Sequence, residues 1–325
     1  MKALCWIITD GSAGLENQAL GLGQALGYKT VIKRVYLRKF WVLFSPYLKF
    51  GKKCCLKKTS DSLKEPFPDL IIACGRRSIL PSLYVKEKSQ GKTRLIYLQD
   101  PKISAKNFDV VVCPQHDTVK GDNVITMIGA PHHVTPEKLE RASLEFEALF
   151  SPYKQPRYGV LLGGPNRVYS LDLAAAQNLA KNLGSLQKNK QVSLIITPSR
   201  RTPVEVLDFF INYFKENKNV YVWDRTGSNP YFGLLALSDV ILLTCDSVIM
   251  ASEVCATKAP AYFLKLPGGS KKFEDFQKSV VDLGRIRWFE KNADPFDVTP
   301  LNLNDQVLSE LIKRGYDASS LSKIS

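Results

Sequence analysis

Short apolar stretches alternate with longer helical patterns along most of the chain. Runs rich in Val, Ile and Leu predict strands in the first half at Leu4–Thr9, Val31–Val35, Asp69–Cys74, Arg94–Leu98, Val110–Cys113 and Val124–Ile128. The corresponding runs in the second half are Tyr158–Leu162, Val192–Thr197, Val220–Trp223, Val240–Thr244 and Ala261–Leu264. Strands that are apolar throughout and separated by helices indicate parallel sheets covered on both faces. The pattern predicts an α/β protein with two Rossmann-like, doubly wound sheets.

A proline-rich stretch marks the boundary between the two halves. Gly129-Ala130-Pro131 precedes a charged helix predicted near Pro136–Phe150, and Ser151-Pro152-Tyr153-Lys154-Gln155-Pro156 follows it. We therefore predict an N-terminal domain of residues 1–150 and a C-terminal domain of residues 151–325 that ends in a helical tail. We expect the two domains to face a central cleft suited to a sugar nucleotide.

Composition narrows the class of protein. No stretch approaches the ~20 apolar residues that are needed to cross a bilayer, and the N-terminal apolar run is too short for a secretory signal. The seven cysteines are scattered and include no CxxC pair, which suits a reducing cytosol and argues against disulfides or a zinc site. We expect a cytoplasmic protein without a metal or cofactor, one able to sit peripherally on the inner face of the membrane.

The formal charge of +14 is concentrated in one segment, Lys29–Lys58, which contains no acidic residue. Its cations are interleaved with the aromatic residues Tyr36, Phe40, Trp41, Phe44, Tyr47 and Phe50. Such a segment favours an anionic membrane surface as a partner, with rings at the headgroup level and cations near the phosphates. Two alternatives are nucleic-acid binding and a solvated insertion whose aromatic residues fill the core. No nucleic-acid motif accompanies the charge, so no nucleic-acid partner is expected.

Ligands of open parallel sheets bind beyond the carboxyl ends of the strands, so the residues after each strand are candidates for a site. Asp10 follows the first strand, where it could act as a general base toward an acceptor hydroxyl, and His116 is the second candidate base. The residues expected to bind the acceptor or an anion are Gly11, Gly14, Asn17, Gln18, Gly75, Arg76, Arg77 and Asp100. The alternative is a helix cap at Asp10, simple turn glycines and merely exposed arginines.

The second half repeats the order of strand, turn and helix start several times. The residues expected to bind a nucleotide sugar are Gly163, Gly164, Asn166, Ser199, Arg200, Arg201, Asn229, Asp246, Ser247 and Glu253. Ser247 could offer its hydroxyl and N–H to a diphosphate, and Glu253 could accept hydrogen bonds from a ribose diol. The alternative is a capped helix with a solvated glutamate. Several such loops at the strand ends of one sheet favour a nucleotide-sugar site.

Taken together, these motifs resemble the "elongated mitochondria" family, which is named after plant mitochondrial fission factors and has bacterial members. The motifs are Asp10-Gly11…Gly14…Asn17-Gln18, Cys74-Gly75-Arg76-Arg77, Gln99-Asp100-Pro101, Pro114…His116-Asp117, Gly163-Gly164-Pro165-Asn166, Ser199-Arg200-Arg201-Thr202-Pro203, Asn229-Pro230-Tyr231 and Asp246-Ser247…Glu253. The likeness covers about residues 4–265. It implies a role like that of the plant proteins, which look like adaptors that recruit a dynamin-related protein to the mitochondrial surface.

The second half is also similar to GT-B glycosyltransferases that modify membrane lipids, such as the peptidoglycan enzyme that adds N-acetylglucosamine to a lipid-linked intermediate. In those enzymes a glycine loop and a serine-to-glutamate helix hold the uridine nucleotide, which matches Gly163-Gly164 and Ser247…Glu253. The histidine of their first glycine loop is replaced here by Leu15, so the resemblance implies that the base is Asp10 or His116, or is absent.

Two functions follow from these expectations. The first is an inverting, metal-independent GT-B glycosyltransferase that moves a sugar from a nucleotide-sugar donor to a lipid-linked or envelope acceptor at the cytoplasmic membrane face. The second is a non-catalytic, membrane-associated adaptor of the mitochondrial-fission-factor type. Fold alone does not distinguish them.

Overall fold

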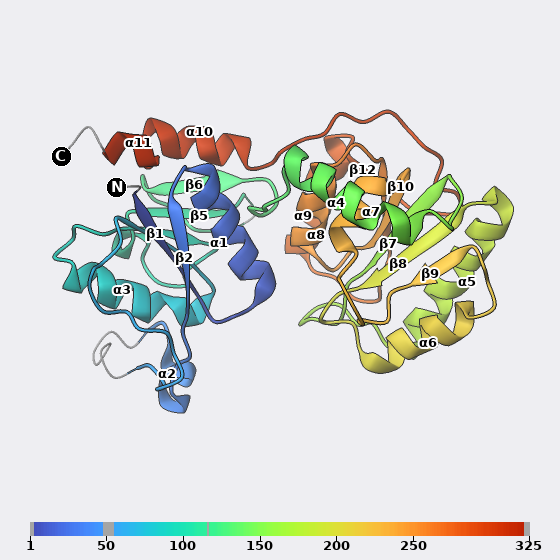
Figure 1. The fold of residues 1–325 in the computed structure, drawn as a ribbon. Helices are drawn as coiled ribbons and strands as arrows, with labels where there is room; N and C mark the ends of the chain where they lie inside the picture. Colours follow the sequence, from blue (N-terminus) through green and yellow to red (C-terminus); the bar gives the residue numbers. More distant parts are fainter. Residues whose placement is uncertain (1–2, 48–54, 116, 322–325) are drawn as a thin grey trace. The chain divides into compact units, whose positions relative to one another are not determined.

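The computed structural model describes residues 3–47, 55–115 and 117–321 (Figure 1). The chain forms two compact units. The first unit contains residues 1–133 and 303–325, and the second contains residues 134–302. Each unit is built on its own six-stranded sheet.

The sheet of the first unit is parallel throughout, in the order β2-β1-β3-β4-β5-β6. Its strands are β1 (Leu4–Thr9), β2 (Lys29–Arg34), β3 (Leu70–Cys74), β4 (Arg94–Leu98), β5 (Val110–Pro114) and β6 (Val124–Met127). The α-helices that connect them are α1 (Ala13–Ala25), α2 (Lys39–Phe44) and α3 (Ile79–Lys88). β3 is buried along its whole length, as expected for a central strand that is covered on both faces.

The sheet of the second unit is also parallel, in the order β12-β11-β10-β7-β8-β9. Its strands are β7 (Arg157–Leu162), β8 (Ser193–Pro198), β9 (Val220–Val222), β10 (Val240–Thr244), β11 (Ala261–Leu264) and β12 (Ile286–Trp288). Its helices are α4 (Pro136–Phe150), α5 (Leu173–Lys190), α6 (Val204–Phe214), α7 (Tyr231–Leu237), α8 (Val248–Cys255) and α9 (Lys271–Asp282). The predicted α/β class with two doubly wound parallel sheets is confirmed.

The two units divide the chain differently from the predicted boundary after residue 150. Helix α4 belongs to the second unit because that unit buries its apolar face: Phe150 lies 6.0 Å from the ring of Tyr221, centroid to centroid. The C-terminal helices α10 (Asp305–Lys313) and α11 (Ala318–Leu321) belong to the first unit. There the Tyr28 hydroxyl donates to the carbonyl of Tyr316 over 3.0 Å.

Six of the seven cysteines lie in the described residues, and each of these six is buried. Burial raises the pKa of the Cys255 thiol to about 11. Within residues 3–47, 55–115 and 117–321, no helix is long and apolar enough to span a bilayer. The same residues include no cluster of His, Cys, Asp and Glu that could hold a metal ion.

Candidate functional site

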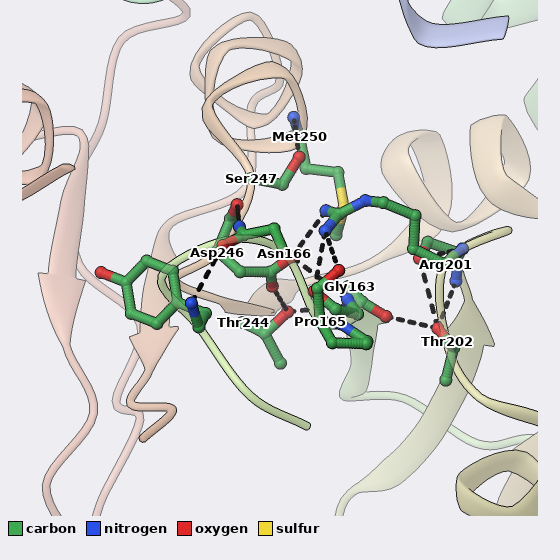
Figure 2. A network of polar contacts seen from close by, with 12 residues as sticks. Gly163, Pro165, Asn166, Arg201, Thr202, Thr244, Asp246, Ser247 and Met250 are labelled. Atoms are coloured by element: carbon green, nitrogen blue, oxygen red, sulfur yellow. Dashed lines mark hydrogen bonds and ion pairs between the residues drawn. The ribbon is translucent and has the colours of Figure 1, made fainter. Parts of the chain in front are cut away.

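Three strand-end loops of the second unit form one hydrogen-bonded network (Figure 2). They follow β7, β8 and β10, and β7 lies between the other two strands in the sheet. Because parallel strands end at the same edge, the loops that contain Gly164, Arg201 and Asp246 meet there. The network therefore occupies the edge of the sheet where the sequence predicted a ligand.

Asp246 is the centre of this network, and its side chain is 0% exposed. Its Oδ2 accepts hydrogen bonds from the N–H of Gly164 (3.1 Å) and from Nη2 of Arg201 (2.6 Å). Its Oδ1 accepts one from the hydroxyl of Thr244 at 2.6 Å. Both carboxylate oxygens are thus used inside the protein. Asp246 positions the surrounding loops, and its buried side chain is not presented to a ligand.

Arg201 clamps the loop that follows β7. Its Nη1 donates to the carbonyls of Gly164 (2.7 Å) and Pro165 (3.2 Å), while Nη2 binds Asp246. Most donors of this guanidinium therefore serve the fold, although 41% of the side chain is exposed. The neighbouring Arg200 is exposed. Of the two predicted arginines, Arg200 is the better placed to reach an anion from solution.

Gly163 and Gly164 are required because other atoms approach them closely. A Cβ on Gly163 would overlap the carboxylate of Asp246, and a Cβ on Gly164 would overlap the main chain of Arg201. The N–H of Gly163 donates to the Thr244 hydroxyl over 2.7 Å, and that of Gly164 donates to Asp246. These two N–H groups are consequently committed to the protein itself.

Asn166 and Ser199 also shape the loops. Nδ2 of Asn166 donates to the carbonyl of Asp246 (3.2 Å), and its Oδ1 accepts from the N–H of Val168 and of Tyr169, each at 2.9 Å. The N–H of Ser199 donates to Oγ1 of Thr202 over 2.9 Å. Both predicted residues are therefore placed at the site as parts of its scaffold.

Two residues that the sequence analysis did not select contribute to the same edge. Thr202 is buried, and its hydroxyl donates to the carbonyl of Gly163. Arg225 has a φ of +72°, and its Nη2 donates to the carbonyls of Ser199 (2.8 Å) and Thr202 (2.6 Å). The turn Asp224-Arg225-Thr226-Gly227 was the only sequence signal for Arg225.

Ser247 begins helix α8. Its Oγ accepts a hydrogen bond from the N–H of Met250 at 3.3 Å, so it is the N-cap. The first N–H groups of a helix have no partner within the helix and carry its positive dipole end. The start of α8, next to the Asp246 network, is therefore the part of this edge that can accept an anion.

Glu253, one helical turn and a half further along α8, is buried with 5% exposure. Its Oε2 accepts a hydrogen bond of 2.5 Å from the hydroxyl of Tyr231. Burial raises the pKa of Glu253 from 4.5 to about 7, opposed by the Tyr231 hydrogen bond and by the positive charge of Lys138 on α4. The Lys138 ammonium lies 4.3 Å from the ring centroid of Phe232. The alternative of a solvated glutamate is thus wrong.

Asn229 belongs to this second cluster. Its Oδ1 accepts from the N–H of Tyr231 at 3.0 Å and so fixes the start of α7. Asn229 and Glu253 are therefore linked through Tyr231. The predicted donor residues divide into the Asp246 network, the N-terminus of α8, and this Tyr231–Glu253 cluster.

In the first unit, Asp10 lies in a tight turn between β1 and α1. Its Oδ1 accepts from the N–H of Ser12 at 3.2 Å, and its Oδ2 lies 3.5 Å from Nη1 of Arg77. Gly11 has a φ of +84°, which the turn requires. The N-cap position of α1 is taken by Ser12. Asp10 is therefore not the helix cap of the alternative interpretation.

Asp100 follows β4. Its Oδ2 pairs with Nζ of Lys102 over 2.5 Å. Burial raises the pKa of Tyr97 well above its ordinary value, and the negative charges of Asp10 and Asp100 add to this effect. The two carboxylates therefore act on the same buried phenol at the end of β4.

Three first-unit candidates lie inside a helix and not in the loop before it. Helix α1 already begins at Ala13, so Gly14, Asn17 and Gln18 lie within it. Gln18 is buried, and its Oε1 lies 3.8 Å from Sγ of Cys74. The loop between β1 and α1 is thus only three residues long, from Asp10 to Ser12.

Gly75 and Arg76 serve the turn after β3. Gly75 has a φ of +88°, and a Cβ there would lie 2.8 Å from a methyl carbon of Leu15. Arg76 binds carbonyls of helix α2, including that of Leu43 at 3.1 Å. Of the two predicted arginines, Arg77 is the one beside Asp10, and its side chain is 52% exposed. The candidate base His116 lies outside the described residues.

Solved structures place the fold among the GT-B proteins. The UDP-N-acetylglucosamine 2-epimerase of Methanocaldococcus jannaschii, in complex with UDP-GlcNAc and UDP, matches with a TM-score of 0.53 and 13% sequence identity. The match covers 97% of this chain and 100% of that one. At this identity the likeness shows the fold alone.

The sequence relatives are closer. A family model described as "Mitochondrial fission ELM1" matches residues 13–314. The mitochondrial fission protein ELM1 of Arabidopsis thaliana is 28% identical over 78% of this chain and 66% of its own length, slightly under two thirds of that protein. An uncharacterized protein of Rickettsia prowazekii is 27% identical, with 95% of this chain and 97% of the other covered.

Proposed function

Because the chain belongs to the mitochondrial fission ELM1 family and has a GT-B fold, we propose that it is a nucleotide-sugar-dependent glycosyltransferase. The acceptor in this proposal is a lipid-linked or envelope molecule at the inner face of the cytoplasmic membrane. The observation that carries the proposal is the convergence of three strand-end loops on Asp246, directly before the N-terminus of α8.

In this proposal the donor diphosphate binds at the start of α8. Backbone N–H groups and the Ser247 hydroxyl would face its oxygens, and Arg200 would add positive charge. A contact with the helix dipole is worth about 0.3–1 kcal/mol when exposed and up to about 2 kcal/mol when partly buried. The Gly163 and Gly164 N–H groups already have partners, so they hold the loop in shape without binding the ligand.

The ribose of the donor would bind at Glu253. Its carboxylate accepts the Tyr231 hydroxyl in the structure, and a ribose diol could take the same place if Tyr231 turned aside. Because burial raises the pKa of Glu253 to about 7, a substantial fraction is protonated near neutral pH. Ribose binding would favour the ionised form, since a diol donates hydrogen bonds.

The reaction would be inverting. The acceptor oxygen forms a bond to the anomeric carbon as the bond to the nucleoside diphosphate breaks, and a base takes the acceptor proton. Asp10 is the candidate base in the described part of the chain. The leaving diphosphate would be stabilised by the α8 N-terminus and by Arg200, without a requirement for a metal ion.

The test is calorimetric titration of the full chain with uridine, adenosine and guanosine diphosphates and with the corresponding nucleotide sugars. We expect one nucleotide to bind, and Glu253→Gln to weaken it about tenfold or more through loss of a charged hydrogen-bond partner. The matched control is Glu205→Gln, because Glu205 is exposed on α6 of the same unit. If the folded protein binds no nucleotide, the donor site does not exist.

The second candidate function is a membrane-associated adaptor without catalysis. One observation favours it: two of the predicted ligand groups already have partners within the protein, Arg201 in Asp246 and Glu253 in Tyr231. The segment Lys29–Lys58 would hold the membrane, although residues 48–54 lie outside the described residues. Asp10→Asn separates the two functions, because it should abolish sugar transfer and leave recruitment of a partner unchanged.

A further inference from the structure

Helix α2 presents an apolar face to solvent. Phe40, Leu43 and Phe44 are 57%, 72% and 42% exposed, and their spacing of three and four residues places them on one side of the helix. The rings of Phe40 and Phe44 lie 4.9 Å apart, centroid to centroid. Tyr36 and Tyr47, 38% and 66% exposed, flank the helix. Contiguous exposed apolar groups of this kind mark interaction sites in soluble proteins.

The helix projects from the first unit beyond the end of β2 (Figure 1). Its opposite side is nevertheless firmly packed. Trp41 is 8% exposed and forms a cluster with Leu37, Cys55 and Leu80 of α3. The exposed face is thus turned outward by a fixed core contact.

Arg76 fixes the end of the same helix. Its Nη2 donates to the carbonyls of Leu43 (3.1 Å) and Val42 (3.3 Å), and its Nε donates to the carbonyl of Ser45. The Ser45 hydroxyl donates back to the carbonyl of Arg76 over 3.2 Å. Arg76 therefore caps the C-terminus of α2 and joins it to the turn after β3.

Positive charge borders the apolar face. Arg38 and Lys39 are exposed at the start of α2. The N–H of Lys57 donates to the carbonyl of Tyr36 at 2.8 Å, which places the exposed Lys57 and Lys58 beside the same segment. Between Lys29 and Lys58 the sequence contains no acidic residue that could neutralise these cations locally.

We propose that α2 is a membrane-insertion element for an anionic bilayer. Phe40, Leu43 and Phe44 enter the boundary between headgroups and acyl chains, while the bordering cations contact lipid phosphates. An anionic bilayer offers an apolar layer for the exposed face of α2 and a dense anionic layer for the cations that border it. This inference rests on the membrane location in the proposed function, but it does not depend on nucleotide binding.

The hydrogen bonds of Arg76 connect the end of α2 to the turn after β3. The turn after β3 also carries Arg77, which lies 3.5 Å from Asp10. When α2 is inserted in a bilayer, only this short turn separates α2 from the strand-end edge of the first sheet. A lipid-anchored molecule would be presented to that edge.

The test is co-sedimentation of the full chain with vesicles of phosphatidylcholine alone and of phosphatidylcholine with phosphatidylglycerol in equal parts. We expect binding to the anionic vesicles only, weakened about tenfold or more in Phe40→Ser/Leu43→Ser/Phe44→Ser. The matched control is Leu144→Ser/Val204→Ser/Tyr213→Ser, which removes side chains that are 78%, 61% and 49% exposed in the second unit. The control should bind like the wild type.

Three results would overturn the proposal. The first is absence of wild-type binding to anionic vesicles, and the second is equal binding by the two triple variants. The third is a wild-type dimer that the α2 variant dissociates without any change in vesicle binding, because a second copy would then cover α2. Nucleotide titration of the α2 variant distinguishes failure of this proposal from failure of the proposed function. The α2 variant should bind nucleotide as the wild type does, whatever its vesicle binding.

Discussion

Nη2 of Arg201 lies 2.6 Å from Oδ2 of Asp246, and this ion pair connects the loops that follow β8 and β10. The carboxylate is fully buried, whereas 41% of the arginine side chain reaches solvent. The same Oδ2 also accepts the N–H of Gly164, so a single carboxylate oxygen holds three loops together.

Asp246→Asn should destabilise the second unit. The substitution removes the charge that pairs with Arg201 and forces an amide group into a site where Oδ2 accepts two hydrogen bonds. We expect a loss of about 1–3 kcal/mol in the free energy of unfolding, below the range for fully buried pairs because Arg201 is partly solvated. Urea unfolding measures it. Asp294→Asn, which breaks an exposed pair with Lys190, should cost less than about 1 kcal/mol.

Gly163→Ala and Gly184→Ala should change stability in opposite directions. A methyl group at Gly163 would overlap the Asp246 carboxylate, so we expect a loss of about 1–3 kcal/mol. At Gly184, within α5, the nearest atoms would lie 3.7 Å from the new Cβ, and alanine favours the helix by about 0.5–1 kcal/mol. Thermal unfolding of both variants checks the prediction. If Gly163→Ala left the stability unchanged, the loop after β7 would have room for the added methyl group.

Glu253 should make stability depend on pH. Its pKa rises from 4.5 to about 7 on folding, so between these values the folded protein holds a proton that the unfolded chain has released. The free energy of unfolding therefore falls as pH rises through this window. Glu253→Gln removes the effect, and its stability relative to wild type should improve by about 2–3 kcal/mol between about pH 5 and pH 8.

Denaturant unfolding at several pH values provides the measurement for Glu253. The exposed Glu205→Gln serves as the control, and its difference from wild type should stay constant with pH. A constant difference for Glu253→Gln as well would mean that the carboxyl is solvated in solution.

Arg76→Gln and Arg77→Gln remove the same charge from neighbouring positions, but only Arg76 binds the carbonyls of α2. We expect amide hydrogen exchange in residues 40–45 to become about tenfold faster or more in Arg76→Gln and to stay unchanged in Arg77→Gln. Vesicle binding should weaken more in Arg76→Gln. Equal exchange in both variants would contradict the capping role of Arg76.

The sheets could be predicted from sequence because their strands are short apolar runs bounded by polar turns. The predicted bounds of β1, β4, β10 and β11 match the structure. β12 was missed because only Ile286 of its three residues is buried, which leaves too weak a pattern. An isolated apolar residue does not distinguish an edge strand from a loop.

The position of the Asp246 network was predictable in outline for the same reason, because it lies at the strand ends. The role of each side chain was not, because it depends on contacts far along the chain. Arg76 meets Ser45, 31 residues away, and Arg201 meets Asp246, 45 residues away. Residue type suggested anion binding for both arginines, whereas Arg76 binds main-chain carbonyls and Arg201 binds main-chain carbonyls and the buried Asp246 carboxylate.

The first unit is assembled from two stretches of chain with the entire second unit between them. Arg94 of β4 donates to the carbonyl of Gly315 over 2.6 Å, and its guanidinium lies 4.4 Å from the ring centroid of Tyr316. During translation these partners leave the ribosome after the whole second unit. Until then the nascent first unit lacks these contacts, and the surface around Arg94 stays uncovered. The second unit already has its whole sequence available to fold at that stage.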